Sequence, residues 1–126
     1  MDCVCYLAKD LDRARGFYEG VLGMIPAIRG DTWVEYEFND GSTFALSKLP
    51  GSDWYPSGGA MFAVHDLQAA LERVRGAGAN VHSDAIETPV CVMVWCTDVE
   101  GNGFALHKRR LSCVQTRPAS TPSIFP

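Results

Sequence analysis

One stretch of the sequence occurs twice, and this internal repeat constrains the fold more than any other feature. Residues 40–48 read DGSTFALSK and residues 100–108 read EGNGFALHK, so the two align without a gap at an offset of 60 residues. Each copy has a Gly after an acidic residue, which favours a turn, and then alternating large and small side chains, which favour a strand. The chain is therefore predicted to be two copies of one structural unit.

The segments that precede the two copies also match each other. Asp10 and Asp66 are predicted helix N-caps, and the apolar positions after them recur 56 residues apart. The expected elements of the first half are a strand over residues 3–8, a helix from Asp10 to Leu22 that Gly23 ends, and strands over residues 24–29, 33–38 and 43–48. Those of the second half are a strand over residues 60–64, a helix after Asp66 that Gly76 and Gly78 close, and strands over residues 80–87, 90–97 and 103–108. The unit is βαβββ, and the fold class is α+β.

Length and composition indicate one domain. With 126 residues the chain has single-domain size, and we expect the domain to span residues 1–108. Module one covers residues 1–48, a linker rich in Pro, Gly and Ser covers residues 49–58, and module two covers residues 59–108. Residues 109–126 lack periodicity and contain three prolines, so they are expected to form a C-terminal tail that is mobile or docked on the partner.

The charge and the cysteines argue against several classes of function. A net charge of −4 and an isoelectric point near 5.2 argue against binding to nucleic acid or to anionic membranes. No apolar run reaches the ~18 residues of a transmembrane helix, and the N-terminus lacks the pattern of a signal peptide. The five cysteines form no Cys-x-x-Cys pair, and we expect free thiols in a reducing cytoplasm.

Alternation assigns the strand residues to two faces. Phe44 and Leu46, like their repeats Phe104 and Leu106, are expected to pack under the helix of their module. The opposite face then carries small and polar residues, so it either pairs with another sheet or lines a cavity. Four large side chains are expected to project into that cavity: Trp33, Phe62, Met93 and Trp95. The alternative is that these side chains only fill space.

Residues 3–108 combine the two βαβββ units with two motifs: the helix Asp-Leu-Asp-Arg-Ala-Arg-Gly-Phe-Tyr and the segment Asp-x-Glu-Gly-Asn-x-Phe-Ala-Leu near the last strand. In these features they resemble the vicinal oxygen chelate superfamily, the group of glyoxalases, bleomycin-resistance proteins and extradiol dioxygenases. The resemblance implies a cupped eight-stranded sheet, a homodimer, and a site inside the cup. In metal-using members, His or Gln and Glu from the first and last strands of each module hold a divalent ion.

The metal ligands that the resemblance implies are missing from this sequence. The four ligand positions fall on Cys3, Ala45, Ala60 and Ala105. Alanine offers no ligand atom, and a single thiol suits a hard divalent ion poorly. We therefore expect no metal ion and no cofactor. A soft, three-coordinate site at His107 with Cys3 or Cys5 is the weaker alternative.

A few other polar residues are candidates for the site. His107 is expected on the cavity face, as a polar contact or as a hydrogen-bonded edge histidine. Glu35 or Glu37 either supplies a carboxylate to a cationic ligand or belongs to a solvated strand face. His65 is expected at a strand end and His82 at an exposed position. The sequence contains no Ser-His-Asp order, phosphate loop or hydride-cofactor fingerprint.

Two hypotheses of different classes follow. The first is metal-independent binding of a small aromatic or cationic molecule, similar to the drug-sequestering members of the superfamily, which need no catalytic group. The second is a lyase or oxidoreductase with an atypical site that uses Glu35, His107 or Cys5 in acid–base chemistry. A scaffold without a ligand is a third hypothesis.

The missing metal ligands favour the binding hypothesis, so we assign no catalytic residue. The expected partners are the small molecule and a second copy of the chain. The expected ligand-binding residues are Cys5, Trp33, Glu35, Trp54, Phe62, Met93, Trp95 and His107.

Overall fold

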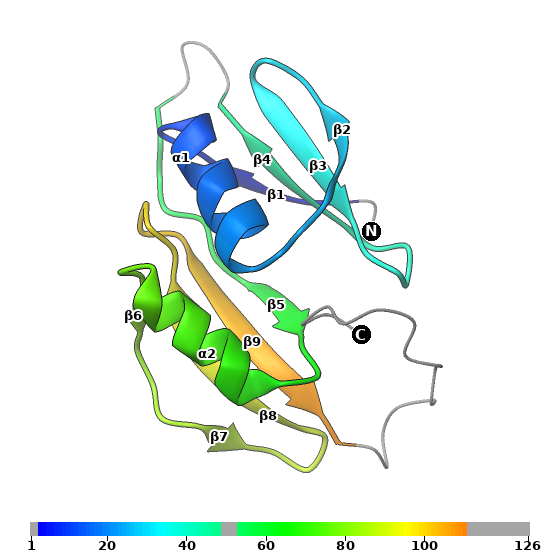
Figure 1. The fold of residues 1–126 in the computed structure, drawn as a ribbon, viewed down its shortest axis with the longest axis vertical. Helices are drawn as coiled ribbons and strands as arrows, with labels where there is room; N and C mark the ends of the chain where they lie inside the picture. The colour runs from blue at the N-terminus through cyan, green and yellow to red at the C-terminus, as the bar shows by residue number, and fades with distance from the viewer. Residues whose placement is uncertain (1–2, 49–52, 111–126) are drawn as a thin grey trace.

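The computed structural model describes residues 3–48 and 53–110 of the chain. The first module contains β1 (Val4–Leu7), α1 (Leu11–Arg15), the π-helical segment η1 (Gly16–Val21), β2 (Pro26–Arg29), β3 (Trp33–Glu37) and β4 (Thr43–Ser47). The second contains β5 (Ala60–Ala63), α2 (Leu67–Gly76), β6 (Asn80–Val81), β7 (Ile86–Glu87), β8 (Cys91–Thr97) and β9 (Gly103–Arg109). The predicted α+β class and the repeated order of elements are confirmed (Figure 1). The expected tail from residue 111 onward, and residues 49–52 of the expected linker, lie outside the described residues.

The strands form two sheets with the same internal pairing. The order is β1-β4-β3-β2 in the first sheet and β5-β9-β8-β6 in the second, where β7 also pairs with β8. In each sheet the first strand of the module runs parallel to the last, and the last runs antiparallel to the one before it. The single eight-stranded sheet that was expected is thus divided into two sheets, one for each module. The strand expected over residues 80–87 is divided into β6 and β7.

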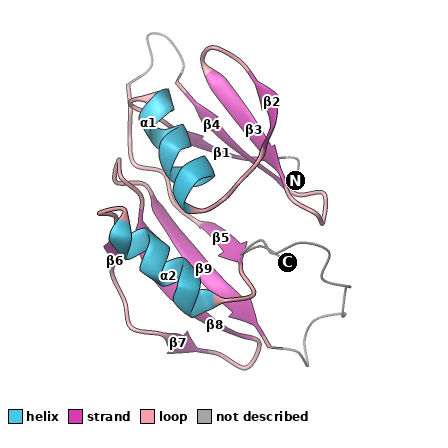
Figure 2. Ribbon diagram, viewed as in Figure 1, coloured by secondary structure: helices cyan, strands magenta, loops and turns pink. Residues whose placement is uncertain are grey.

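The two helices lie on the same side of the sheets, α1 over the first sheet and α2 over the second (Figure 2). One face of each sheet is therefore covered by a helix, and we call the opposite face the open face. No helix among residues 3–48 and 53–110 is long and apolar enough to cross a membrane.

Both helical segments, α1 continued by η1 and α2, begin and end where the sequence predicts, although the π-helical turn of η1 was not expected. In each case an aspartate carboxylate accepts a hydrogen bond from the backbone N–H three residues on, at 3.2 Å for Asp10 and 3.0 Å for Asp66. Gly23 and Gly78 follow the helices with φ of +79° and +77°, a left-handed conformation that favours glycine. The repeated caps fix both ends of both helical segments.

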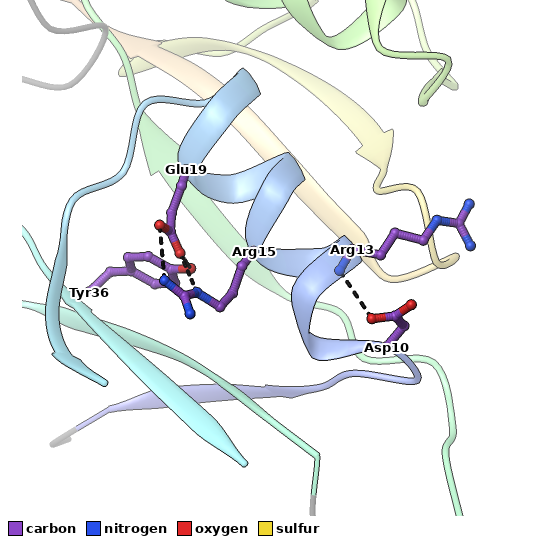
Figure 3. Close-up of polar contacts among 5 residues, drawn as sticks. All are labelled: Asp10, Arg13, Arg15, Glu19 and Tyr36. Atoms are coloured by element: carbon purple, nitrogen blue, oxygen red, sulfur yellow. Dashed lines mark hydrogen bonds and ion pairs between the residues drawn. The ribbon is translucent and has the colours of Figure 1, made fainter. Parts of the chain in front are cut away.

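A polar contact ties the first helical segment to the first sheet (Figure 3). Glu19 accepts hydrogen bonds from the Tyr36 hydroxyl at 2.8 Å and from Arg15 Nε at 2.7 Å. Burial, followed by the hydrogen bond to Glu19, raises the pKa of Tyr36, so its hydroxyl remains a donor at neutral pH. The helix is thereby held over the covered face of β3.

An aromatic cluster fills the space between the helices and both sheets. Its rings come from both modules, and neighbouring ring centroids lie 5.0 to 6.4 Å apart. The members are Tyr6, Phe17, Tyr18, Tyr36, Phe38, Phe44, Phe62 and Phe104. The contact between Phe44 and Phe62, at 5.2 Å, joins the two modules directly. The modules therefore share one core.

The turn between β8 and β9 binds the first module through polar groups. Asn102 is fully buried; it accepts a hydrogen bond from Ser57 N at 2.8 Å and donates one to Leu7 O at 3.1 Å. Glu100 accepts hydrogen bonds from the two backbone N–H groups just before α1, at 3.0 and 2.7 Å. The Asp-x-Glu-Gly-Asn segment of the sequence is thus a joint between the modules.

Two buried tyrosines of the first module complete this joint. The Tyr18 hydroxyl donates to Asp98 Oδ2 at 2.6 Å, and burial, followed by the charge of Asp98, raises the pKa of Tyr18. The Tyr6 hydroxyl donates to Gly103 O at 2.5 Å and accepts from Ala60 N at 2.9 Å. Every one of these contacts crosses from one module to the other, so the modules pair within one chain.

The first copy of the repeat is bonded differently. Asp40 accepts hydrogen bonds from the backbone N–H and the hydroxyl of Ser42, at 3.0 and 2.6 Å, inside its own exposed turn. Ser42 occupies the repeat position of Asn102. The pair Asn102 and Ser42 therefore compares a buried joint residue with an exposed residue at the same place in the repeat.

We predict that Asn102→Ala lowers the free energy of unfolding by about 2 to 3 kcal/mol, because it leaves the part-buried Ser57 N–H without its acceptor and removes the bond to Leu7 O. Urea unfolding followed by circular dichroism measures the change. Ser42→Ala is the matched control and is expected to stay within about 0.5 kcal/mol of the parent protein. Equal losses for the two variants would contradict the joint.

Candidate functional site

The strand register determines which side chains share the open faces, because directly paired residues point to the same side of a sheet. Two rows cross the open face of the second sheet: Met61, Ala105 and Trp95 in the first row, and Ala63, His107 and Met93, followed by Ile86 of β7, in the second. Two rows also cross the open face of the first sheet: Cys5, Ala45 and Glu35 in one, and Leu7, Ser47 and Trp33 in the other.

The open face of the second sheet carries large apolar side chains in contact with solvent. Met61, Trp95 and Ile86 are 43%, 38% and 41% exposed. Ala105 lies between Met61 and Trp95 and is buried. Large apolar groups thus surround a floor of small side chains, which is the composition of a binding surface for a flat molecule.

The open face of the first sheet is acidic and contains thiols. Glu35 is half-buried, and Glu37 of the same strand and face is exposed. Trp33 is 37% exposed, close to the value of Trp95. Partial burial, followed by the neighbouring Cys3 and Glu35, raises the pKa of Cys5, so this thiol is protonated at neutral pH and is a weak nucleophile.

The placement of Phe62 in a cavity with the tryptophans is wrong. Phe62 pairs with Leu106 on the covered face of the second sheet and is buried in the aromatic cluster, 5.2 Å from Phe44 and 5.9 Å from Phe104. The segment Ala-Met-Phe-Ala-Val is apolar at every position, so its alternation does not distinguish the two faces. Pairing with β9 decides, and it puts Met61 on the open face instead.

The structure gives Trp54 contacts at the joint between the modules. Its Nε1 donates to Leu7 O at 3.2 Å, and Lys9 Nζ lies 3.8 Å from the ring centroid. The ring edge also lies 3.8 Å from the point where a Cβ at Gly101 would stand. These contacts explain the tryptophan structurally, and its role as a ligand-binding residue stays a prediction.

His107 is the polar residue at the centre of the second open face. It is only 8% exposed, and its Nδ1 is buried without a hydrogen-bond partner. Burial, followed by the charge of Arg109, lowers the pKa of His107, so the imidazole is neutral at pH 7. The other two histidines are exposed, and His82 hydrogen-bonds Thr97.

The residues present do not fit the metal site that the resemblance implies. Ala45 and Ala105 lie on the open faces, where a ligand would have to stand, and neither has a donor atom. Ala60 was expected there too, but it pairs with Phe104 on the covered face, so that placement is wrong. The residue 56 positions after Cys3 is Gly59, which also has no donor. Among residues 3–48 and 53–110, no group of three or more His, Cys, Asp or Glu side chains is placed to hold a metal ion.

Comparisons with known proteins agree with this fold. The model of the family described as Glyoxalase/Bleomycin resistance protein/Dioxygenase superfamily matches residues 1–106. The Anthracycline biosynthesis protein DauV of Streptomyces sp. (strain C5) is 29% identical over 108 residues, which cover 82% of this chain and 39% of that protein. The chain therefore spans well under half the length of this curated relative.

Solved structures with the same fold have diverse descriptions. TnmS3, an antibiotic binding protein from Streptomyces sp. CB03234, superposes with a TM-score of 0.71 at 18% identity, covering 87% of this chain and 95% of that one. The oxidase ChaP-H2 superposes with a TM-score of 0.70 at 16% identity, covering 87% of this chain and 93% of that one. At these identities the likeness concerns the fold alone.

We predict that His107 makes the protein less stable in acid. Because its pKa is lowered in the folded state, the unfolded chain binds more protons as the pH falls through about 6.5, so stability is full above that pH and declines below it. The urea midpoint of His107→Leu should therefore fall less than that of the parent protein between about pH 7.5 and pH 5.5. His65→Gln, at an exposed strand end, should keep the parental fall. If the urea midpoint of His107→Leu falls as far as that of the parent protein, His107 is not the source of the loss of stability in acid.

Proposed function

The chain belongs to the Glyoxalase/Bleomycin resistance protein/Dioxygenase superfamily, and from this premise we propose that it binds a small aromatic molecule on the open faces of its sheets without using a metal ion. The observation that carries the proposal is the second open face. There Met61 and Trp95 expose apolar surface on either side of the small side chain of Ala105, and Ile86, which pairs with Met93, extends this surface onto β7. An aromatic ring laid on such a surface gains apolar burial and ring stacking.

Two relatives support an antibiotic-like ligand. TnmS3 is described as an antibiotic binding protein, and DauV as an anthracycline biosynthesis protein. We propose a ligand of similar chemistry, flat and aromatic, for this chain. The acidic residues Glu35 and Glu37 on the first open face would suit a ligand that also carries a cationic group.

An enzyme with an atypical site is the second candidate function. The oxidase ChaP-H2 shares the fold, and His107 offers a neutral, buried imidazole with an unpartnered nitrogen. Against it stand the alanines at the expected ligand positions and the protonated thiol of Cys5. Elemental analysis of protein purified without chelator, with and without added Ni²⁺, Mn²⁺, Fe²⁺ and Zn²⁺, tests the metal-dependent form of this candidate. A stoichiometric metal ion would overturn metal-independent binding.

We predict that Trp95→Ala weakens the binding of pyrene, a flat aromatic probe, at least tenfold, because the variant removes the largest ring from the second open face. Isothermal titration calorimetry measures the affinity, and circular dichroism checks that the variant is folded. Tyr55→Ala, which removes an exposed aromatic residue outside the strands, is the control and should bind pyrene as the parent does. Unchanged binding by Trp95→Ala would show that the face is wrongly assigned.

We also propose that the protein is a homodimer and works in the cytoplasm. The open faces expose apolar side chains that a second copy can cover: Ile28, Trp33, Met61, Ile86 and Trp95. Burial of such a surface would stabilise association, and it would enclose a ligand between the two copies.

We predict that the chain sediments as a dimer at micromolar concentration. Sedimentation velocity measures this directly. Met61→Glu places a charge on the open face at an exposed position and should shift the equilibrium toward the monomer, whereas Gln68→Glu on the exposed side of α2 should not. A parent protein that sediments at 13.8 kDa under these conditions would rule the dimer out.

A further inference from the structure

The two modules match on their covered faces and differ on their open faces. Repeat positions on the covered faces hold similar residues, such as Phe44 and Phe104 or Leu46 and Leu106. On the open faces the equivalent positions hold different residues: Glu35 of the first sheet corresponds to Trp95 of the second. In the same way, Ser47, Trp33 and Cys5 of the first sheet correspond to His107, Met93 and Met61 of the second. The second open face is therefore the more apolar of the two, and its chemistry differs from that of the first.

The second open face can hold a fused ring system without help from the first. Met61, Ala105 and Trp95 stand on three adjacent strands, β5, β9 and β8. Three strands span about 10 Å at the usual spacing, which is the width of a few fused rings. The short side chains of the alanines leave space above the centre of this face, so a flat molecule can approach the sheet there.

One polar atom within this apolar surface lacks a partner. Nδ1 of His107 is shielded from solvent and makes no hydrogen bond, a state that costs free energy until a partner is supplied. His107 pairs directly with Ala63 on one side and Met93 on the other, and methionine is flexible enough to move aside for a ligand. Folding has thus already removed water from Nδ1, so a polar group of a ligand can bind this nitrogen without a further cost of desolvating it.

We propose that the second open face selects flat aromatic molecules that bear a free hydroxyl group, with His107 as the residue that binds this hydroxyl. This inference rests on the proposed function and specifies its ligand. With the proton of the neutral imidazole on Nε2, Nδ1 is an acceptor, so a hydroxyl group can donate to it and a methoxy group cannot. An amine is disfavoured at this position, because the charged residue on the same face of β9 is the cationic Arg109.

Three matched probes test the proposal: pyrene, methoxypyrene and hydroxypyrene, titrated at pH 7 by calorimetry into the parent protein and into His107→Phe. The parent should bind hydroxypyrene about tenfold more tightly than the other two, the size of one good hydrogen bond. His107→Phe should bind all three alike. His65→Phe, at an exposed position, is the matched control and should keep the tenfold preference.

The outcomes separate this inference from the proposed function. If the parent binds none of the three probes, the proposed function fails and this inference fails with it. If the parent binds all three equally, or if His107→Phe keeps the preference, the aromatic site stands and the role of His107 is overturned. A fourth probe, the cation pyrenemethylamine, tests the acidic alternative. Tightest binding of this probe, abolished by Glu35→Gln and not by Glu72→Gln on α2, would overturn the hydroxyl preference.

A measurement on the parent protein covers the case in which His107→Phe does not fold. In protein labelled with ¹⁵N-histidine, hydroxypyrene should shift the Nδ1 resonance of His107, and methoxypyrene should shift it much less. Equal shifts by the two probes would overturn the proposal, because ring proximity alone would then explain them.

Discussion

The structure depends on the polar joint between the two modules. The turn from Asp98 to Asn102 supplies buried acceptors and donors to the end of β1, to the start of α1 and to Tyr18. Buried polar groups of this kind are costly when unpaired, so they admit one relative placement of the modules. The aromatic cluster adds apolar burial to this placement but tolerates more variation in geometry. The joint therefore sets where the two open faces stand.

A division of labour between the two faces of each sheet follows. The covered faces contribute to a shared core, where volume and shape restrict every side chain, and the repeat is preserved there as Phe-Ala-Leu. The open faces carry no helix, so their residues diverge without loss of packing. His107 and Ser47, or Trp95 and Glu35, occupy matching positions with unrelated chemistry. The asymmetry that a binding site needs therefore lies on the faces that do not hold the fold together.

Sequence reasoning predicted what local patterns determine. The caps at Asp10 and Asp66, the repeated turns and the faces of β3, β4, β8 and β9 follow from spacing and from clean alternation. Two classes of feature could not be predicted from local sequence patterns. The face of Phe62 depends on a pairing partner because its strand is apolar throughout, and the joint depends on contacts between residues about 90 positions apart, such as Glu100 and Asp10. Trp54 belongs to the same class, since its neighbours come from β1 and from the distant turn.

The joint also makes the two halves of the tandem repeat non-equivalent, because each half supplies different residues to it. Its turn residues come from the second half, where Asn102 stands in place of Ser42, and its tyrosines come from the first, where Tyr6 stands in place of Phe62. A symmetrical protein assembled from two first halves would lack the turn, and one assembled from two second halves would lack the Tyr6 hydroxyl. The two halves have thus become complementary, and neither can replace the other in a duplicated gene.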